Sequence, residues 1–225
     1  MTVPRVENLR ADKWASLTPE ERLEALQELE NKLAQQRGEQ PCLVETIPEE
    51  DRDLEDGEIR TRGQYIPSNG GPGTIQIDPG LVSSDQPYQA VETLFHEDRH
   101  AYQAYAVQHP EIHDNPEEVE DWRQNLNGGY IESDYAYYRW QPVEADANQI
   151  ARKRTDELYS GEFQDSEKYP DYRAEKEQEI SDDIEYAKTS IGENYQEEAR
   201  QAMIKKYQNN LEQQESEDYY YGYGY

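Results

Sequence analysis

Residues 87 to 110 form a stretch with a proline at each end and apolar residues at helical spacing between them. Apolar side chains that recur every three to four residues lie on one face of an α-helix. Proline fits the first turn of a helix but breaks its interior. The sequence therefore predicts one helix that begins near Pro87 and ends before Pro110. Its apolar positions are Ala90, Val91, Leu94, Phe95, Ala101, Ala104, Tyr105 and Val107.

An earlier helix is predicted by its start and stop signals. Thr18 can cap the helix, Pro19 fits the first helical position, and Glu21 completes a capping box. Gly38 and Pro41 end it. The apolar stripe between these signals consists of Leu23, Leu26, Leu29, Leu33 and Ala34.

Further helices are predicted downstream. Residues 115 to 126 form a short one, which Gly128 and Gly129 stop, and residues 141 to 159 form a longer one with Pro142 near its start. Two apolar runs at helical spacing then flank Gly192 and predict a helical hairpin. They consist of Ile180, Ile184, Ala187 and Ile191, and of Tyr195, Ala199, Met203, Tyr207 and Leu211.

The sequence of residues 43 to 80 is typical of β-strands. The segments EIRTRGQYI (58–66) and TIQID (74–78) both alternate between apolar and polar residues, and the Gly-rich turn SNGGPG (68–73) separates them. Such a pattern predicts an antiparallel hairpin. The Gly-rich turn is not a phosphate-binding loop, because neither a Lys-Ser/Thr pair nor a helix start follows it.

We therefore expect an α+β fold that is mostly helical, with a small antiparallel sheet and a C-terminal helical hairpin. The expected division is one domain over residues 1–160 and an acidic helical extension over 161–215. Residues 216–225 are rich in Tyr and Gly, and we expect them to form a disordered tail.

The charge of the chain limits the kinds of partner that it can bind. The formal net charge is −28, which would repel the phosphate backbone of nucleic acids and favours a basic protein partner. Cys42 is the only cysteine, so neither an internal disulfide nor a Cys-based zinc site can form. The first residues do not resemble a signal peptide, and no apolar run is long enough to span a membrane. We expect a cytoplasmic protein, or one exported without an N-terminal signal.

The predicted helix over 87–110 contains the motif H-E-x-x-H, formed by His96, Glu97 and His100. Residues four apart lie on the same face of a helix, so the two imidazoles can point at one metal ion. Glu97 is the next residue around the helix and can take a proton from a water on the ion. Zinc commonly binds three protein side chains and keeps a fourth position for water.

The third ligand must come from elsewhere in the chain. Glu144, near the start of the helix predicted over 141–159, is the favoured candidate, and Asp146 is its rival on another side of that helix. His109 and His113 are also four apart, but Pro110 lies between them and interrupts the helix.

HEDRHAYQ (96–103) together with QPVEADANQIAR (141–152) resembles the zincin metallopeptidases of the gluzincin type. In particular it is similar to bacterial and phage zincin-like domains, some of which are toxins or secreted effectors, over about residues 20–160. The resemblance implies a zinc motif of His96, Glu97 and His100, with Glu144 as the third ligand. It also implies an edge strand to which a peptide substrate pairs, with TIQID as its counterpart. Asn148 stands where thermolysin-like members have an aspartate that supports a histidine.

The expected function is therefore zinc-dependent hydrolysis of peptide bonds. His96, His100 and Glu144 would bind Zn²⁺, and Glu97 would pass a proton from water to the leaving amine. The substrate would be a peptide or protein, and neither nucleic acid nor membrane is an expected partner. Two alternatives stay open. The first is a toxin or effector with the same chemistry, which would have an immunity protein as partner, and the second is a non-catalytic acidic protein that docks a basic partner.

Overall fold

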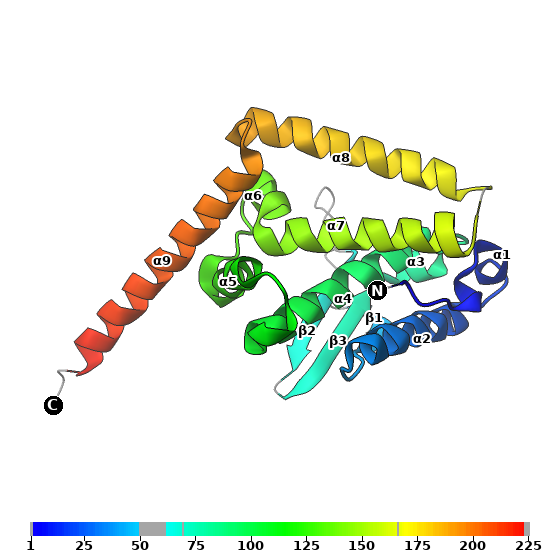
Figure 1. Cartoon of the computed structure of the whole chain (residues 1–225), viewed down its shortest axis with the longest axis horizontal. Coiled ribbons are helices and arrows are strands. Elements are labelled where there is room, and N and C mark those ends of the chain that lie inside the picture. The colour runs from blue at the N-terminus through cyan, green and yellow to red at the C-terminus, as the bar shows by residue number, and fades with distance from the viewer. Residues whose placement is uncertain (1, 50–61, 69, 166, 223–225) are drawn as a thin grey trace. The chain divides into compact units, whose positions relative to one another are not determined.

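The computed structural model describes residues 2–49, 62–68, 70–165 and 167–222, and it is mostly helical with one small sheet (Figure 1). The strands are β1 (Leu43–Thr46), β2 (Gly63–Ser68) and β3 (Gly71–Ile77). The helices are α1 (Ala11–Trp14), α2 (Pro19–Arg37), α3 (Pro79–Ser83), α4 (Tyr88–Gln108), α5 (Pro116–Gln124), α6 (Tyr135–Trp140), α7 (Pro142–Asp156), α8 (Tyr169–Ile191) and α9 (Tyr195–Gly222). No helix in these ranges combines the length and apolar character needed to cross a bilayer.

Helix α2 confirms the predicted capping box. The Glu21 backbone N–H donates to Thr18 Oγ1 at 3.3 Å, and the Thr18 backbone N–H donates to Glu21 Oε2 at 2.8 Å. These two bonds satisfy N–H groups that have no partner within the helix. The helix ends at Gly38 as predicted, and α2 contacts β1 (Figure 1).

The sheet has the order β1-β3-β2. The predicted antiparallel hairpin is confirmed for β2 and β3, whereas β1 pairs parallel to β3, so the sheet is mixed rather than antiparallel. The expectation that TIQID forms an edge strand is wrong, because residues 74–77 belong to β3, which is paired on both sides. Turn signals identify neighbours in sequence, but they do not reveal a parallel strand from further up the chain. Of the predicted strand 58–66, residues 58–61 lie outside the described residues.

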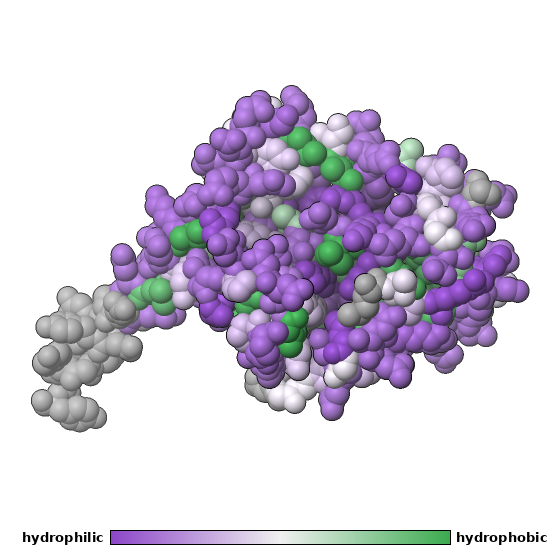
Figure 2. Space-filling view, in the orientation of Figure 1, coloured by the Kyte–Doolittle hydropathy of each residue, from purple (hydrophilic) through white to green (hydrophobic). Residues whose placement is uncertain are grey.

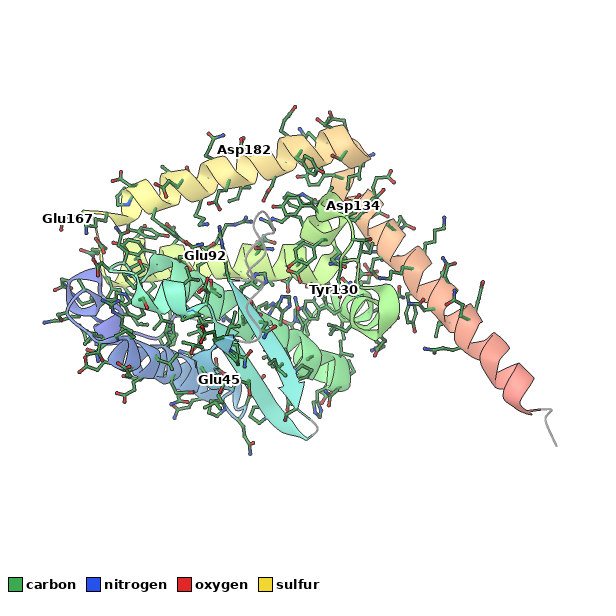
Figure 3. All side chains as sticks on the ribbon, turned by 180° about the vertical axis from the view of Figure 1, so that it is seen from behind. Glu45, Glu92, Tyr130, Asp134, Glu167 and Asp182 are labelled. Carbon is green, nitrogen blue, oxygen red and sulfur yellow. The ribbon has the colours of Figure 1, made fainter. Side chains whose placement is uncertain are left out.

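A row of polar side chains crosses one face of the sheet. Gln64 Nε2 donates to Gln76 Oε1 at 2.6 Å, and Gln76 Nε2 donates to Glu45 Oε1 at 2.7 Å; Glu45 is labelled in Figure 3. On the opposite face Ile75 and Ile77 are fully buried. Because a shift of one residue would exchange the two faces, this pattern fixes the register of the strands.

Contacts between residues divide the chain into two compact units. The first consists of Met1–Tyr102 and Ala147–Glu175, and the second of Gln103–Asp146 and Lys176–Tyr225. The boundaries fall inside the continuous helices α4, α7 and α8. The domain ranges 1–160, 161–215 and 216–225 stay a prediction.

The first unit contains the main core. The sheet, α2, α4 and the second half of α7 all contribute buried apolar side chains to it. Its fully or almost fully buried members include Leu26, Leu29, Leu33, Val44, Ile75, Ile77, Val91, Leu94, Phe95 and Ala151. This packing fixes the first part of α4, in which the H-E-x-x-H motif lies.

The second unit has a smaller core, which includes Trp140, Ala187 and Ala199. The ring of Tyr195 packs edge-on against Trp140 with the centroids 4.6 Å apart. Helices α8 and α9 confirm the two helical runs predicted on either side of Gly192. Helix α9 continues to Gly222, into the range that we expected to be a disordered tail, because glutamate and tyrosine do not interrupt a helix.

The face shown in Figure 2 is predominantly hydrophilic, with apolar side chains in small, separate areas. This agrees with the chain's formal net charge of −28. Electrostatic attraction is therefore the main long-range force that this surface can exert on a partner.

Candidate metal centre

The predicted helix over 87–110 is confirmed as α4, and it brings the two histidines of the motif together. The Nε2 atoms of His96 and His100 lie 2.9 Å apart. Two nitrogen ligands of a tetrahedral zinc ion lie about 3.3 Å apart when each is about 2.0 Å from the metal. A small outward movement of the rings would therefore fit an ion. Both Nε2 atoms would then have to be unprotonated, with the ring protons on Nδ1.

Helix α7 supplies the third side chain of the cluster. Glu144 lies in the first turn of α7 and is 3% exposed. Ligand atoms of His96, His100 and Glu144 all lie within 4.8 Å of one another. In the described part of the chain, no other group of three or more His, Cys, Asp or Glu side chains was found that could hold a metal ion. The three residues that the sequence selected as ligands are thus the three that the structure brings together.

Asp146, the rival candidate, is not a member of this cluster. Its Oδ2 accepts a hydrogen bond of 2.7 Å from Gln103 Nε2, which also donates to the Val143 carbonyl at 3.0 Å. Gln103 is fully buried and lies one turn after His100. Asp146 therefore ties α7 to the second half of α4, and Glu144 is the residue of the two that lies in the cluster.

The other two histidines lie apart from the cluster. His113 Nε2 is 2.8 Å from Glu118 Oε2, and its ring packs against Trp122 with the centroids 4.7 Å apart. His109 Nδ1 is 3.8 Å from Glu111 Oε1. Pro110 begins a separate short turn, as its ring prevents α4 from continuing.

The donor set fits zinc. Two imidazole nitrogens and one carboxylate oxygen form a common catalytic zinc site, in which water or substrate takes the remaining position. Magnesium and calcium prefer sets made of oxygen ligands alone. The cluster could therefore hold a metal ion.

Glu97 lies close to the first residue of β2. A Cβ atom on Gly63 would be 3.1 Å from Glu97 Oε1 and 2.5 Å from the Cγ2 methyl of Thr93. Real Cβ atoms do not approach another carbon to 2.5 Å, so β2 can lie this close to α4 only because residue 63 is glycine. Glu97 is 6% exposed. Gly63 therefore helps to define the space that the Glu97 carboxylate occupies.

Asp98, inside the motif, anchors α4 from its other side. It is fully buried, and two arginines bind it. The Nη1 and Nη2 atoms of Arg37 lie 3.0 Å from Oδ2 and 2.7 Å from Oδ1, and Nη1 of Arg154 lies 2.7 Å from Oδ2. Burial alone would raise the pKa of Asp98, but the two guanidinium charges outweigh it and lower the pKa. Asp98 is thus an anion that joins α2, α4 and α7.

Glu30 of α2 lies beside this anion. Its Oε1 accepts a hydrogen bond of 2.9 Å from the Cys42 backbone N–H. Burial, followed by the negative charge of Asp98, raises the pKa of Glu30 to about 8. At neutral pH Glu30 is therefore mostly protonated, and it can donate its proton to Asp98.

Tyr130 contacts the candidate ligand directly. Its hydroxyl donates a hydrogen bond of 2.7 Å to Glu144 Oε1. Burial, and then the negative charge of Glu144, raises the pKa of Tyr130 above its ordinary value, so the phenol stays a donor. Sequence reasoning missed both Tyr130 and Gly63. The glycine pair before Tyr130 indicated a helix end, and no spacing rule connects either residue with the motif.

Comparisons of the chain with protein-family models, with curated proteins and with solved structures find no match.

Proposed function

We propose that the protein is a zinc-dependent metallopeptidase with a zincin-like site of the gluzincin type. The observation that carries this proposal is the cluster of His96, His100 and Glu144, whose ligand atoms lie within 4.8 Å of one another. An H-E-x-x-H helix combined with a glutamate from a later helix is the arrangement that the resemblance implies.

Each residue has a chemical task in this proposal. His96, His100 and Glu144 hold the ion, and the helices α4 and α7 position them. When bound, zinc supplies a Lewis acid that polarises the scissile carbonyl and makes a water molecule more acidic. Glu97 accepts the proton of the attacking water and delivers it to the leaving amine. Its low exposure keeps bulk water from competing for that proton.

The substrate in this proposal is an extended peptide that pairs with β2. Among the strands of the described residues, β2 lies at an edge of the sheet, and its residues 66–68 are exposed. Its first residue, Gly63, lies next to Glu97. A peptide that adds to a strand gains backbone hydrogen bonds, and its side chains can be read alternately. In this role β2 replaces the TIQID segment, which lies in the centre of the sheet.

The net charge of −28 favours peptides that contain lysine and arginine over acidic ones. The same acidity would suit a basic protein partner, including an immunity protein if the chain is a toxin or effector. The place of action that we propose is the cytoplasm, either of the cell that makes the protein or of a cell that receives it as an effector.

The test compares Glu97→Gln with wild type after reconstitution with zinc. A library of peptides serves as substrate, and mass spectrometry identifies the products. We expect wild type to cleave, and Glu97→Gln to keep its zinc but lose at least about 100-fold in rate, as is typical when a general base is removed. Glu24→Gln is the matched control, since Glu24 is exposed on α2, and it should cleave like wild type.

Two outcomes would contradict the proposal. If Glu97→Gln cleaves at the wild-type rate, Glu97 is not the base. If zinc-loaded wild type cleaves no peptide of the library, the acidic interaction protein becomes the better account of this chain.

A further inference from the structure

The Tyr130 hydroxyl binds one of the two carboxylate oxygens of Glu144. The 2.7 Å hydrogen bond from the Tyr130 hydroxyl ends on Oε1, and Glu144 is 3% exposed. A carboxylate can bind a metal through one oxygen or through both. A strong donor on one oxygen favours the mode in which only the other binds.

A buried amide pair holds the segment that contains Tyr130 against the start of α7. Gln141 Oε1 accepts from the Ile131 backbone N–H at 2.9 Å, and Gln141 Nε2 donates to the Ile131 carbonyl at 3.1 Å. Asn125 Nδ2 donates to the same Gln141 oxygen at 2.9 Å, while Asn125 Oδ1 accepts from the Val143 backbone N–H at 3.2 Å. Asn125 and Gln141 are fully buried. A buried network with its partners in place is rigid, so residue 131 is fixed relative to the turn that contains Glu144.

Helix α9 also holds the segment that contains Tyr130. Lys206 Nζ donates to the Tyr130 carbonyl, and Asn210 Nδ2 donates to the Gly128 carbonyl at 2.6 Å. A Cβ atom on Gly129 would be 2.9 Å from the sulfur of Met203, so α9 packs directly on the glycine backbone. The Tyr130 carbonyl is thus held by α9, and the backbone of its neighbour Ile131 by Gln141, while the Tyr130 hydroxyl reaches Glu144; Tyr130 is labelled in Figure 3.

We propose that Tyr130 is a positioning residue that makes Glu144 bind the metal through a single oxygen, and that α9 keeps Tyr130 in place through Lys206. This proposal rests on the proposed metal site. Binding through one oxygen keeps the coordination number low and preserves a position for water or for the substrate carbonyl. Without the hydroxyl, Oε1 of Glu144 would lose its hydrogen bond from Tyr130, and nothing from residue 130 would oppose its binding to the ion.

Cobalt reports on this directly, because its visible absorption is strong in four-coordinate sites and weak in sites with more ligands. We would load wild type and Tyr130→Phe with Co²⁺, record the visible spectrum, and measure Co²⁺ affinity by competition with a chelator. We expect Tyr130→Phe to show weaker visible bands, and its Kd to rise by about 10-fold or more, the usual cost of removing a group that orients a ligand.

Tyr135→Phe is the matched control. The Tyr135 hydroxyl donates a hydrogen bond of the same length, 2.7 Å, to Asp183. Tyr135→Phe removes a hydrogen bond between a tyrosine and a carboxylate but leaves Glu144 unchanged. The visible spectrum and the Kd for Co²⁺ should therefore both stay at wild-type values.

A second pair of variants tests the same idea without altering Tyr130. Lys206→Met removes the donor to the Tyr130 carbonyl, and Lys205→Met changes its exposed neighbour. We expect Lys206→Met to raise the Kd for Co²⁺ by about 2- to 5-fold, in the direction of Tyr130→Phe but less. Lys205→Met should leave the Kd unchanged.

The proposal is overturned if Tyr130→Phe folds with the wild-type spectrum and a Kd within twofold of wild type. Should Tyr130→Phe fail to fold, an unchanged Kd in Lys206→Met overturns it instead. If wild type binds neither Co²⁺ nor Zn²⁺, the metal site itself is refuted. This outcome differs from the one in which wild type binds the metal but Tyr130 has no influence on the site.

Discussion

Arg154 on α7 lies 2.7 Å from Asp98 on α4, measured from Nη1 to Oδ2. Asp98 stands midway between the two histidines of the motif, and it also binds Arg37 of α2. The helix that presents the imidazoles is thus held by a buried anion on its opposite side. An ion pair of this kind contributes little net stability as a whole, but the loss of one partner leaves a buried charge without its full compensation.

Arg154→Met should therefore lower the free energy of unfolding by about 1–3 kcal/mol, since Arg37 still compensates part of the Asp98 charge. Urea denaturation followed by circular dichroism measures this change. Lys153→Met is the control, because Lys153 is 69% exposed and 4.0 Å from Glu157, and surface pairs contribute almost nothing. Equal midpoints for the two variants would show that Arg154 does not stabilise Asp98.

Glu30 makes stability depend on pH in a direction unusual for a carboxylate. Its pKa rises from 4.5 to about 8 on folding, so between these values the folded protein binds a proton that the unfolded chain releases. The free energy of unfolding must then fall as pH rises through this window, by at most about 1.4 kcal/mol per pH unit from this group. Glu30→Gln should remove that contribution, because an amide can donate to Asp98 at any pH.

The measurement is the urea midpoint of wild type and Glu30→Gln at each pH from 5 to 9. We expect the advantage of Glu30→Gln over wild type to grow with pH and to level off above about pH 8. Glu24→Gln serves again as the exposed control. Parallel curves for wild type and Glu30→Gln would refute a raised pKa at this residue.

The close packing at Gly63 predicts that a single methyl group at residue 63 displaces Glu97, the proposed base. Gly63→Ala would place a Cβ atom 2.5 Å from the Thr93 methyl and 3.1 Å from Glu97 Oε1. We expect peptide cleavage to fall by about 10- to 100-fold, because small errors in position are costly in catalysis, while zinc binding is kept. Gly161→Ala is the control, since a Cβ atom there meets nothing within 4 Å.

The double variant Gly63→Ala, Thr93→Ser removes the methyl that would clash, and it should recover much of the lost activity. If cleavage by Gly63→Ala equals that of wild type, β2 does not restrict Glu97. If the double variant is no better than Gly63→Ala, the loss does not come from the contact with Thr93.

The sequence was most informative where the pattern is local. The spacing of His96 and His100 on an amphipathic helix, the capping box of α2 and the position of Glu144 in a helix start are all properties of a few neighbouring residues, and the structure agrees with each. The parallel pairing of β1 with β3, the contact of Gly63 with α4 and the bond from Tyr130 to Glu144 join residues far apart in the chain. No periodicity or turn signal encodes such contacts, because they depend on how the finished elements pack.

The proposed preference for basic substrates predicts that the cleavage of basic peptides depends on the salt concentration. The chain's charge of −28 should attract a peptide rich in lysine and arginine, and the attraction is screened as the Debye length shrinks. We expect kcat/KM for such a peptide to fall severalfold between about 0.05 and 0.5 M salt. A neutral peptide of the same length should change little. The same salt response for both peptides would argue against electrostatic selection.

The zinc content of the purified protein tests the central claim most directly. After reconstitution and removal of loosely bound metal, elemental analysis should find about one zinc ion per chain in wild type and in His113→Ala, and little in His96→Ala or Glu144→Ala. His113 is the matched control because it pairs with Glu118, outside the cluster. Wild type without stoichiometric zinc, or His96→Ala and Glu144→Ala with as much zinc as His113→Ala, would contradict the account.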